Sequence, residues 1–235
     1  MASSSILTGP SIDTKDWKAV ASIIDHTLLK PETSRDQVIQ LCEEALSFGF
    51  CTAFVHPSYT SLAASILQGS PVKVGTPIGF PLGASLTSTK RFETEEALRA
   101  GAQEIDMVIN NGALKSGDRN RVQLDIQGVA EIAHAGGAIL KVIIEAGLLT
   151  MEEKILACEL SLLGGADFVK TSTGWFGGGA TVDDVALMRG VVGDRAGVKA
   201  SGGIRRAAEV AAMVAAGANR IGTSAAVQII HELRG

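Results

Sequence analysis

One pattern recurs along this chain and limits the folds it can adopt. An alanine-rich amphipathic helix ends at a glycine, and a short strand-like run follows at once, most clearly in residues 98–106, 163–170 and 216–224. Glycine is a common residue at a helix stop, and short runs rich in β-branched residues indicate strands. Helices and strands are therefore expected to alternate, as they do around a parallel sheet.

The pattern predicts about eight strands. They are expected near residues 22–25, 51–56, 72–79, 104–110, 139–145, 167–172, 197–201 and 220–223. Eight strands with helices between most of them are the number that closes a (β/α)₈ barrel, and barrels of about 235 residues commonly form one domain. We predict an α/β protein with a single (β/α)₈ barrel over residues 19–235, preceded by a flexible or partly helical lead-in over 1–18. A doubly wound open sheet is the alternative, but no glycine fingerprint follows the first strand.

Composition agrees with this fold and excludes several functions. Hydrophobic residues make up 46% of the chain and aromatic residues only 4%, so Ala, Val, Ile and Leu must build the core. A net charge of -4 provides no basic field for nucleic acid or an anionic membrane. Cys42, Cys51 and Cys158 are odd in number and lack metal-ligand spacing, which indicates a reducing compartment and no metal. With neither a membrane-length apolar run nor a secretory signal, a cytoplasmic protein is expected.

Charged residues lie in or directly after the predicted strands. They are Asp25, Asp106, Lys141, Glu145, Lys170 and Lys199. In a barrel such residues are accepted mainly at the C-terminal mouth, where catalytic residues gather. Strand alternation places Lys141 and Glu145 on one side of their strand. For Asp25, Lys141 and Glu145, an unreactive buried ion-pair network and a supporting role in proton transfer both stay open.

Lys170 and Lys199 each end a buried run. Two ammonium groups close together raise the free energy of the doubly charged pair, which favours a neutral amine. Because a neutral lysine is a strong nucleophile towards carbonyl carbon, the pair predicts a reactive amine.

Glycines and small hydroxyl residues follow the last three predicted strands. Backbone N–H groups in such turns bind phosphate, most often after the seventh and eighth strands of this fold. The predicted phosphate site comprises Thr171, Gly174, Gly202, Gly203, Gly222, Thr223 and Ser224. The alternative is that these glycines only form tight turns. A separate glycine run, 177–179, follows Trp175 and Phe176 and is expected to be a flexible loop that closes over the mouth.

Five segments carry a family resemblance. They are IDHTLL at 24–29, EIDMVIN at 104–110, LKVIIE at 140–145, DFVKTSTG at 167–174 and VKASGGIR at 198–205. In this order they resemble the motifs of the deoxyribose-phosphate aldolase family over nearly the whole chain beyond residue 20. The resemblance implies a class I aldolase of deoxyribose phosphate catabolism, acting without metal or other cofactor. Its expected reaction is reversible cleavage of 2-deoxy-D-ribose 5-phosphate to D-glyceraldehyde 3-phosphate and acetaldehyde.

The resemblance also implies residue roles. Lys170 would form the Schiff base, Lys199 would lower the pKa of Lys170, and Asp106 would transfer protons together with Lys199. The supporting proton network would comprise Lys141, Asp25, Thr27 and Glu145. The partners implied are a small sugar phosphate, an aldehyde and further copies of the chain in a homodimer or homotetramer.

Two positions depart from the family pattern. Ser224 is followed by Ala225 where relatives often have two serines, so one phosphate hydroxyl is expected to be missing. Residues 54–57 read FVHP where relatives have Cys and Asn or Tyr. Two other functions remain open: a Schiff-base barrel aldolase for a different phosphorylated aldehyde or ketose, and a non-catalytic sugar-phosphate-binding barrel.

Overall fold

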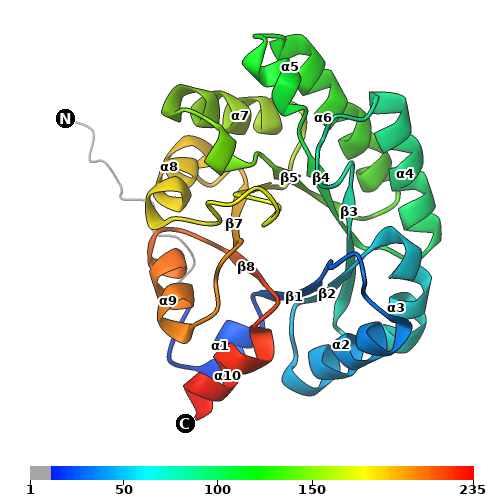
Figure 1. Ribbon diagram of the computed structural model, residues 1–235, viewed down its shortest axis with the longest axis vertical. Helices are drawn as coiled ribbons and strands as arrows, with labels where there is room; N and C mark the ends of the chain where they lie inside the picture. Colours follow the sequence, from blue (N-terminus) through cyan, green and yellow to red (C-terminus); the bar gives the residue numbers. More distant parts are fainter. Residues whose placement is uncertain (1–11) are drawn as a thin grey trace.

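The computed structural model describes residues 12–235, which form a closed barrel of eight parallel strands surrounded by helices (Figure 1). Each strand pairs with the next one in the chain, and β8 pairs with β1 to close the barrel. The strands are β1 (Ile24–Leu28), β2 (Thr52–Val55), β3 (Lys73–Ile78), β4 (Glu104–Val108), β5 (Ile139–Ile143), β6 (Phe168–Lys170), β7 (Gly197–Ser201) and β8 (Arg220–Thr223). The predicted (β/α)₈ barrel is confirmed. Residues 1–11 of the predicted lead-in lie outside the described residues.

Helices follow the strands and cover the outside of the barrel. They are α1 (Trp17–Ala21), α2 (Arg35–Phe48), α3 (Thr60–Leu67), α4 (Thr87–Arg99), α5 (Asn111–Lys115), α6 (Arg119–Ala135), α7 (Met151–Leu163), α8 (Val182–Val192), α9 (Ala207–Ala215) and α10 (Ala226–Arg234), with short 3₁₀ turns η1 (Pro57–Tyr59) and η2 (Ala146–Leu148). No helix within residues 12–235 is long and apolar enough to cross a membrane.

The first strand begins later than the sequence pattern predicts. Residues 22 and 23 were expected in the strand, but Ser22 instead ends α1, where its backbone N–H donates to Lys18 O at 3.0 Å. The Ser22 hydroxyl also donates to Ala19 O at 2.8 Å. These local bonds satisfy the helix end, so the extended chain starts only at Ile24.

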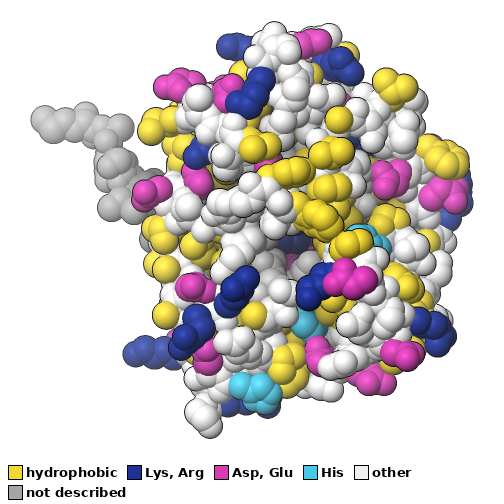
Figure 2. Space-filling view, in the orientation of Figure 1, with side chains coloured by type: hydrophobic (Ala, Val, Ile, Leu, Met, Phe, Trp, Pro, Cys, Tyr) yellow, Lys and Arg dark blue, Asp and Glu magenta, His cyan; other side chains and the backbone are white. Residues whose placement is uncertain are grey.

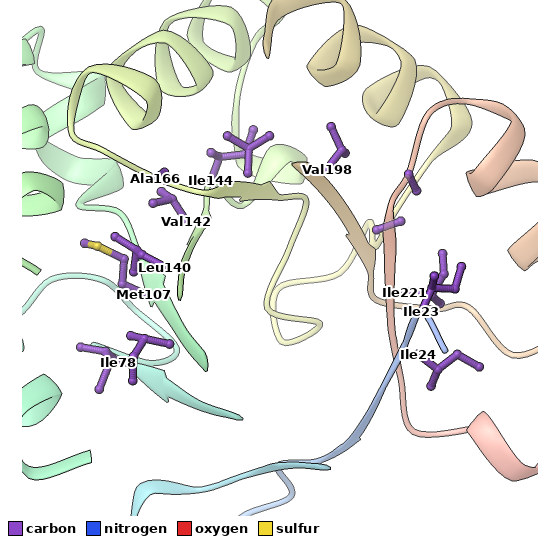
Figure 3. Close-up of a cluster of buried hydrophobic side chains, with 14 of the residues drawn as sticks. Ile23, Ile24, Ile78, Met107, Leu140, Val142, Ile144, Ala166, Val198 and Ile221 are labelled. Atoms are coloured by element: carbon purple, nitrogen blue, oxygen red, sulfur yellow. The ribbon is translucent and has the colours of Figure 1, made fainter. Parts of the chain in front are cut away.

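The hydrophobic core lies between the strands and the helices. Figure 3 shows Ile24, Met107, Leu140, Val198 and neighbouring apolar side chains on the outer side of the strands, towards the ring of helices. All four are fully buried, and burial of one such side chain stabilises a fold by about 1.5–3 kcal/mol. Because side chains alternate along a strand, the opposite face of each strand points into the barrel.

Glycines inside the barrel leave room for large side chains on neighbouring strands. A Cβ atom on Gly75 would lie 2.3 Å from Phe54 Cδ2, and one on Gly222 would lie 2.9 Å from Lys199 Cε. Real Cβ atoms do not approach so closely. Glycine at these two positions therefore allows an aromatic ring and a lysine to occupy the barrel interior.

Candidate active site

The strand register brings the predicted lysines together. Lys170 of β6 pairs with Lys199 of β7, and Asp106 of β4 pairs with Lys141 of β5. All four side chains are buried inside the barrel, and Lys170 is the most exposed of them at 4%. Parallel strands in register place residues of the same level side by side, so this cluster follows from the closure of the barrel.

Asp106 is the centre of the cluster. Its Oδ2 accepts hydrogen bonds from Lys170 Nζ at 2.8 Å and from Lys199 Nζ at 2.7 Å, and its Oδ1 accepts one from Lys141 Nζ at 3.0 Å. Burial alone would raise the pKa of Asp106, but the three neighbouring amines hold that pKa well below its ordinary value. Asp106 is therefore a carboxylate.

A second layer of charges lies deeper in the barrel, and sequence reasoning missed two of its members, Glu104 and Arg220. Glu104 Oε2 accepts from Lys141 Nζ at 2.6 Å and from Arg220 at 2.8 Å. Asp25 accepts from Arg220 Nε at 3.0 Å and forms an ion pair with Lys199 Nζ at 2.5 Å. Glu104 precedes Asp106 by two residues, so strand alternation was the available signal. Arg220 is the first residue of the last predicted strand, so strand alternation was the available signal for it too.

Opposite charges keep three of these buried groups, Asp25, Lys141 and Arg220, ionised. Burial disfavours the charged form of each group, yet the opposite charges prevail. They hold the pKa of Asp25 below its ordinary value and the pKa values of Lys141 and Arg220 above theirs. Each of these groups remains charged near neutral pH.

Lys170 differs from the other cations of this cluster. Burial lowers its pKa most strongly, Asp106 opposes this, and the Lys199 ammonium adds to the lowering, so that the pKa is about 8 instead of 10.5. Within the described residues Lys170 forms an ion pair with Asp106 alone, whereas Lys141 and Lys199 each contact two carboxylates. Lys170 therefore combines a lowered pKa with the fewest carboxylate contacts of the three amines.

A cavity of about 380 Å³ opens above this cluster at the C-terminal ends of the strands, and Lys170 is part of its lining. Figure 2 shows the same face hollowed near its centre, with Lys or Arg side chains beside the hollow. Two of the lining residues, Lys30 and Arg205, are exposed cations that sequence reasoning did not select. The cavity thus combines a buried amine at its base with positive charge at its rim.

Six of the seven predicted phosphate-binding residues line this cavity. They are Gly174, Gly202, Gly203, Gly222, Thr223 and Ser224. Thr171 is not among the lining residues: it is buried, its hydroxyl donates to Ser201 O at 2.9 Å and it accepts from Ser201 N at 3.0 Å. The Thr171 hydroxyl links the residue that follows β6 to β7, and its expected role in phosphate binding stays a prediction.

Comparison with known proteins places the chain in a family. Residues 19–229 match the profile described as DeoC/LacD family aldolase. The chain belongs to this family of aldolases. A protein of Halalkalibacterium halodurans named deoxyribose-phosphate aldolase is 55% identical over 215 residues, which cover 91% of this chain and 96% of that protein.

Two solved structures are also similar to this aldolase. A Coccidioides immitis protein, put forward as a deoxyribose-phosphate aldolase, matches with a TM-score of 0.91 and 43% identity, covering 97% of this chain and 88% of that one. The deoxyribose phosphate aldolase of Aeropyrum pernix, described as a unique tetramer, matches with a TM-score of 0.87 and 36% identity, covering 93% and 92%.

Glu145 does not join the charge network of the aldolase, in contrast to its predicted supporting role. β5 ends at Ile143, and Glu145 adopts a left-handed backbone conformation with φ of 55° and ψ of 61°, which interrupts the strand alternation. Its Oε2 accepts from Thr173 N at 2.9 Å, and no hydrogen bond joins it to Lys141 within residues 12–235. Glu145 instead holds the segment that follows Lys170.

Thr27, the other polar residue of the predicted network, lines the cavity. Its hydroxyl donates to the backbone carbonyl of Asp25 at 2.8 Å, and no hydrogen bond joins its side chain to a lysine within the described part of the chain. Thr27 thus lies at the cavity wall, whereas Asp25 is in the ion-pair layer below.

The glycine-rich loop of the aldolase extends across the mouth of the barrel (yellow in Figure 1). Trp175 lines the cavity and packs edge-on against Phe80, with ring centroids 6.1 Å apart. Ala180 N donates to Gly202 O at 2.9 Å, and a Cβ on Gly179 would lie 2.5 Å from that same oxygen. The loop is therefore anchored to the turn after β7 through a close backbone contact that requires glycine.

The remaining candidate groups are less suited to chemistry. Burial raises the pKa of the Cys42 thiol to about 11 and that of Cys158 to about 12, so neither is a ready nucleophile. His26 contacts Glu44 at 2.7 Å, away from the cavity lining. Within residues 12–235 no group of three His, Cys, Asp or Glu side chains is arranged to hold a metal ion.

Proposed function

We propose that this aldolase cleaves 2-deoxy-D-ribose 5-phosphate reversibly to D-glyceraldehyde 3-phosphate and acetaldehyde through a Schiff base on Lys170. The name of the Halalkalibacterium relative supports the substrate. The observation that carries the proposal is that Lys170 combines a pKa of about 8 with a place in the cavity lining. Among the three lysines of the cluster, Lys170 alone lines the cavity that the described residues form.

The proposed reaction begins when neutral Lys170 Nζ adds to the C1 aldehyde carbon, and loss of water gives an iminium ion. Electrons of the C2–C3 bond flow into the iminium as that bond breaks, and a base accepts the proton of the C3 hydroxyl. This step releases D-glyceraldehyde 3-phosphate and leaves an enamine. Protonation of the enamine at C2 and hydrolysis of the imine then release acetaldehyde and free Lys170.

Asp106 and Lys199 are the proposed groups for proton transfer. Lys199 Nζ donates to Asp106 Oδ2 at 2.7 Å, and Lys170 Nζ donates to the same oxygen at 2.8 Å. Lys199 also contacts the Asp25 carboxylate and is not part of the cavity lining, so it is less suited than Lys170 to attack carbonyl carbon. Lys141 is proposed to keep Asp106 in place and ionised, and Asp25 to hold Lys199 beside it.

The phosphate is proposed to lie at the glycine turns after β6, β7 and β8. Gly202 and Gly203 lie between β7 and α9, and Ser224 lies between β8 and α10, so the backbone of these turns lines this part of the cavity. Lys30 and Arg205 add positive charge at its rim. These features support a phosphorylated substrate over a neutral sugar.

Cellular location and assembly are proposed on separate grounds. The free thiols Cys42, Cys51 and Cys158 support a reducing compartment such as the cytoplasm. The tetrameric Aeropyrum relative supports a homo-oligomer, either a dimer or a tetramer.

Borohydride trapping tests the proposed nucleophile. Incubation with 2-deoxy-D-ribose 5-phosphate and sodium borohydride is expected to place a reduced adduct on Lys170, identified by peptide mass spectrometry. Lys154→Met, which changes a lysine outside the barrel interior, serves as the control and should be trapped normally. An adduct on another lysine, or none, would refute the assignment. Equal cleavage rates for phosphorylated and unphosphorylated deoxyribose would refute the phosphate site.

A further inference from the structure

Phe54 is a buried aromatic residue inside the barrel, among the charged groups. Its neighbours on β2, Ala53 and Val55, belong to the hydrophobic core outside the strands, whereas Phe54 points the other way. The ring is fully buried, and its register partner on β3 is Gly75, whose missing Cβ leaves space for it. Glycine at position 75 thus leaves space for the Phe54 ring beside the amine cluster.

The ring lies next to all three amines but at different distances. Its centroid is 4.5 Å from Lys199 Nζ, 5.2 Å from Lys170 Nζ and 6.0 Å from Lys141 Nζ. An apolar ring at this position occupies space that water would otherwise fill, which disfavours an ammonium ion. Its face, however, attracts a cation, and most strongly the nearest one.

The charge balance of the cluster favours the loss of one proton from its amines. In the described residues the cluster holds three carboxylates, and Lys141, Lys199 and Arg220 supply three matching positive charges. A protonated Lys170 would add a fourth cation to a dry interior. Lys170 also has one carboxylate contact where Lys199 has two. A dry cluster therefore favours loss of a proton, and these contacts favour Lys170 as the residue that loses it.

We propose that Phe54 is a positioning residue for the Schiff-base lysine: it excludes water from the amine cluster and presents its ring face closest to Lys199, so that Lys170 loses its proton more readily than Lys199. This inference rests on the proposed role of Lys170 and adds a group that acts on the nucleophile without touching substrate. The charged groups that face Lys170 are Asp106 on β4, Lys141 on β5 and Lys199 on β7, with Asp25, Glu104 and Arg220 below them.

The test is the pH dependence of acetaldehyde trapping on Lys170 by borohydride, measured by mass spectrometry in the wild-type protein, Phe54→Ala and Phe54→Leu. The wild-type midpoint is expected near pH 8. Phe54→Ala admits water, so its midpoint should move about one unit to higher pH, with about tenfold less adduct at pH 7. Phe54→Leu keeps most of the apolar volume and loses the ring face, so it should move in the same direction by less.

Phe50→Leu is the matched control. Phe50 is also buried, but it packs against His26 and Phe48 outside the amine cluster, so this variant loses the same ring without a change in midpoint. Circular dichroism checks that each variant is folded. If Phe54→Ala does not fold, the midpoint measured for Phe54→Leu tests the inference.

The outcomes separate this inference from the proposed function. A folded Phe54 variant with a normal Lys170 adduct and an unmoved midpoint would overturn the inference alone. So would a midpoint shift of equal size in Phe50→Leu. A wild-type protein that is trapped on a different lysine would overturn the proposed function and, with it, the inference.

Discussion

Lys170 and Lys199 occupy paired positions on β6 and β7, and both donate a hydrogen bond to the same oxygen of Asp106. Two ammonium groups on one oxygen repel each other, and burial denies them the solvent that would screen this repulsion. The proton is lost from the amine with fewer carboxylate partners. The shared contact with Asp106 therefore makes the two lysines differ in how readily they lose a proton.

Replacement of Lys199 tests its electrostatic effect on the nucleophile. Lys199→Leu removes a positive charge that lowers the pKa of Lys170, so that pKa should rise by about one unit or more. The acidic limb of kcat/KM against pH should shift to higher pH, together with a loss of activity at every pH. Lys154→Leu, which removes the Lys154–Asp184 ion pair at 2.5 Å, is the control. An unshifted acidic limb would argue against the effect.

Replacement of Lys170 should abolish activity and stabilise the protein near neutral pH. The pKa of Lys170 is 10.5 in an unfolded chain and about 8 in the folded protein. Between these two pH values the unfolded chain binds more protons than the folded chain. The free energy of unfolding of the wild-type protein therefore increases as the pH rises from about 8 to 10.5. Below pH 8 the shift costs about 3 kcal/mol of the free energy of unfolding.

Lys170→Met removes this cost. Urea unfolding should show the variant more stable than the wild-type protein by up to about 3 kcal/mol at pH 7, with the difference shrinking towards pH 10.5. A variant that is less stable at pH 7 and shows no pH-dependent difference would contradict the lowered pKa.

Arg205 at the cavity rim should contribute to phosphate binding. Arg205→Met is expected to raise KM for 2-deoxy-D-ribose 5-phosphate about tenfold, because a charge-assisted contact to the phosphate is lost. KM for unphosphorylated deoxyribose should not change. Arg206→Met is the control, since Arg206 is paired with Glu232 at 2.6 Å and is not part of the cavity lining. Equal effects of both variants on both substrates would exclude a specific role for Arg205.

Glu145 should act on the loop and not on proton transfer. In Glu145→Gln the side-chain amide oxygen can still accept from Thr173 N, so the pH profile and KM should stay close to those of the wild-type protein. Glu145→Ala loses that bond, and faster hydrogen exchange in residues 173–180 with a raised KM is expected. A displaced pH profile in Glu145→Gln would instead support the proton network first predicted from the sequence.

The fold was largely predictable because its signal is local and repeated. Helix stops at glycine and short apolar runs recur often enough to count about eight strands, and the structure contains a closed barrel of eight over residues 12–235. The boundary at Ser22 was missed because a helix-ending hydrogen bond outweighed the β-branched residues that follow it. The break at Glu145 was missed because a left-handed backbone at a glutamate has no sequence signal.

The candidate site was predictable in part, for a related reason. Lys170, Lys199 and Asp106 were selected because charged residues in buried strands have few acceptable places in a barrel. Glu104, Arg220 and Phe54 were not selected, although each follows the same alternation. Thr171 was selected as a phosphate ligand, but its hydroxyl is used by Ser201. Which inward residues contact each other depends on strand stagger and closure, which no single strand encodes.

The sequence by itself determined the alternation of helices and strands, the number of strands and the identity of the charged residues on them, because each depends on neighbouring positions in the chain. Only the tertiary structure gave a physical reason why Lys170, and not Lys199, is proposed to lose its proton. That difference depends on how many carboxylates contact each amine, on the exclusion of water and on the ring of Phe54, and the residues responsible come from β1, β2, β4, β6 and β7. Closure of the barrel brings them within a few ångströms, where charge and burial act together.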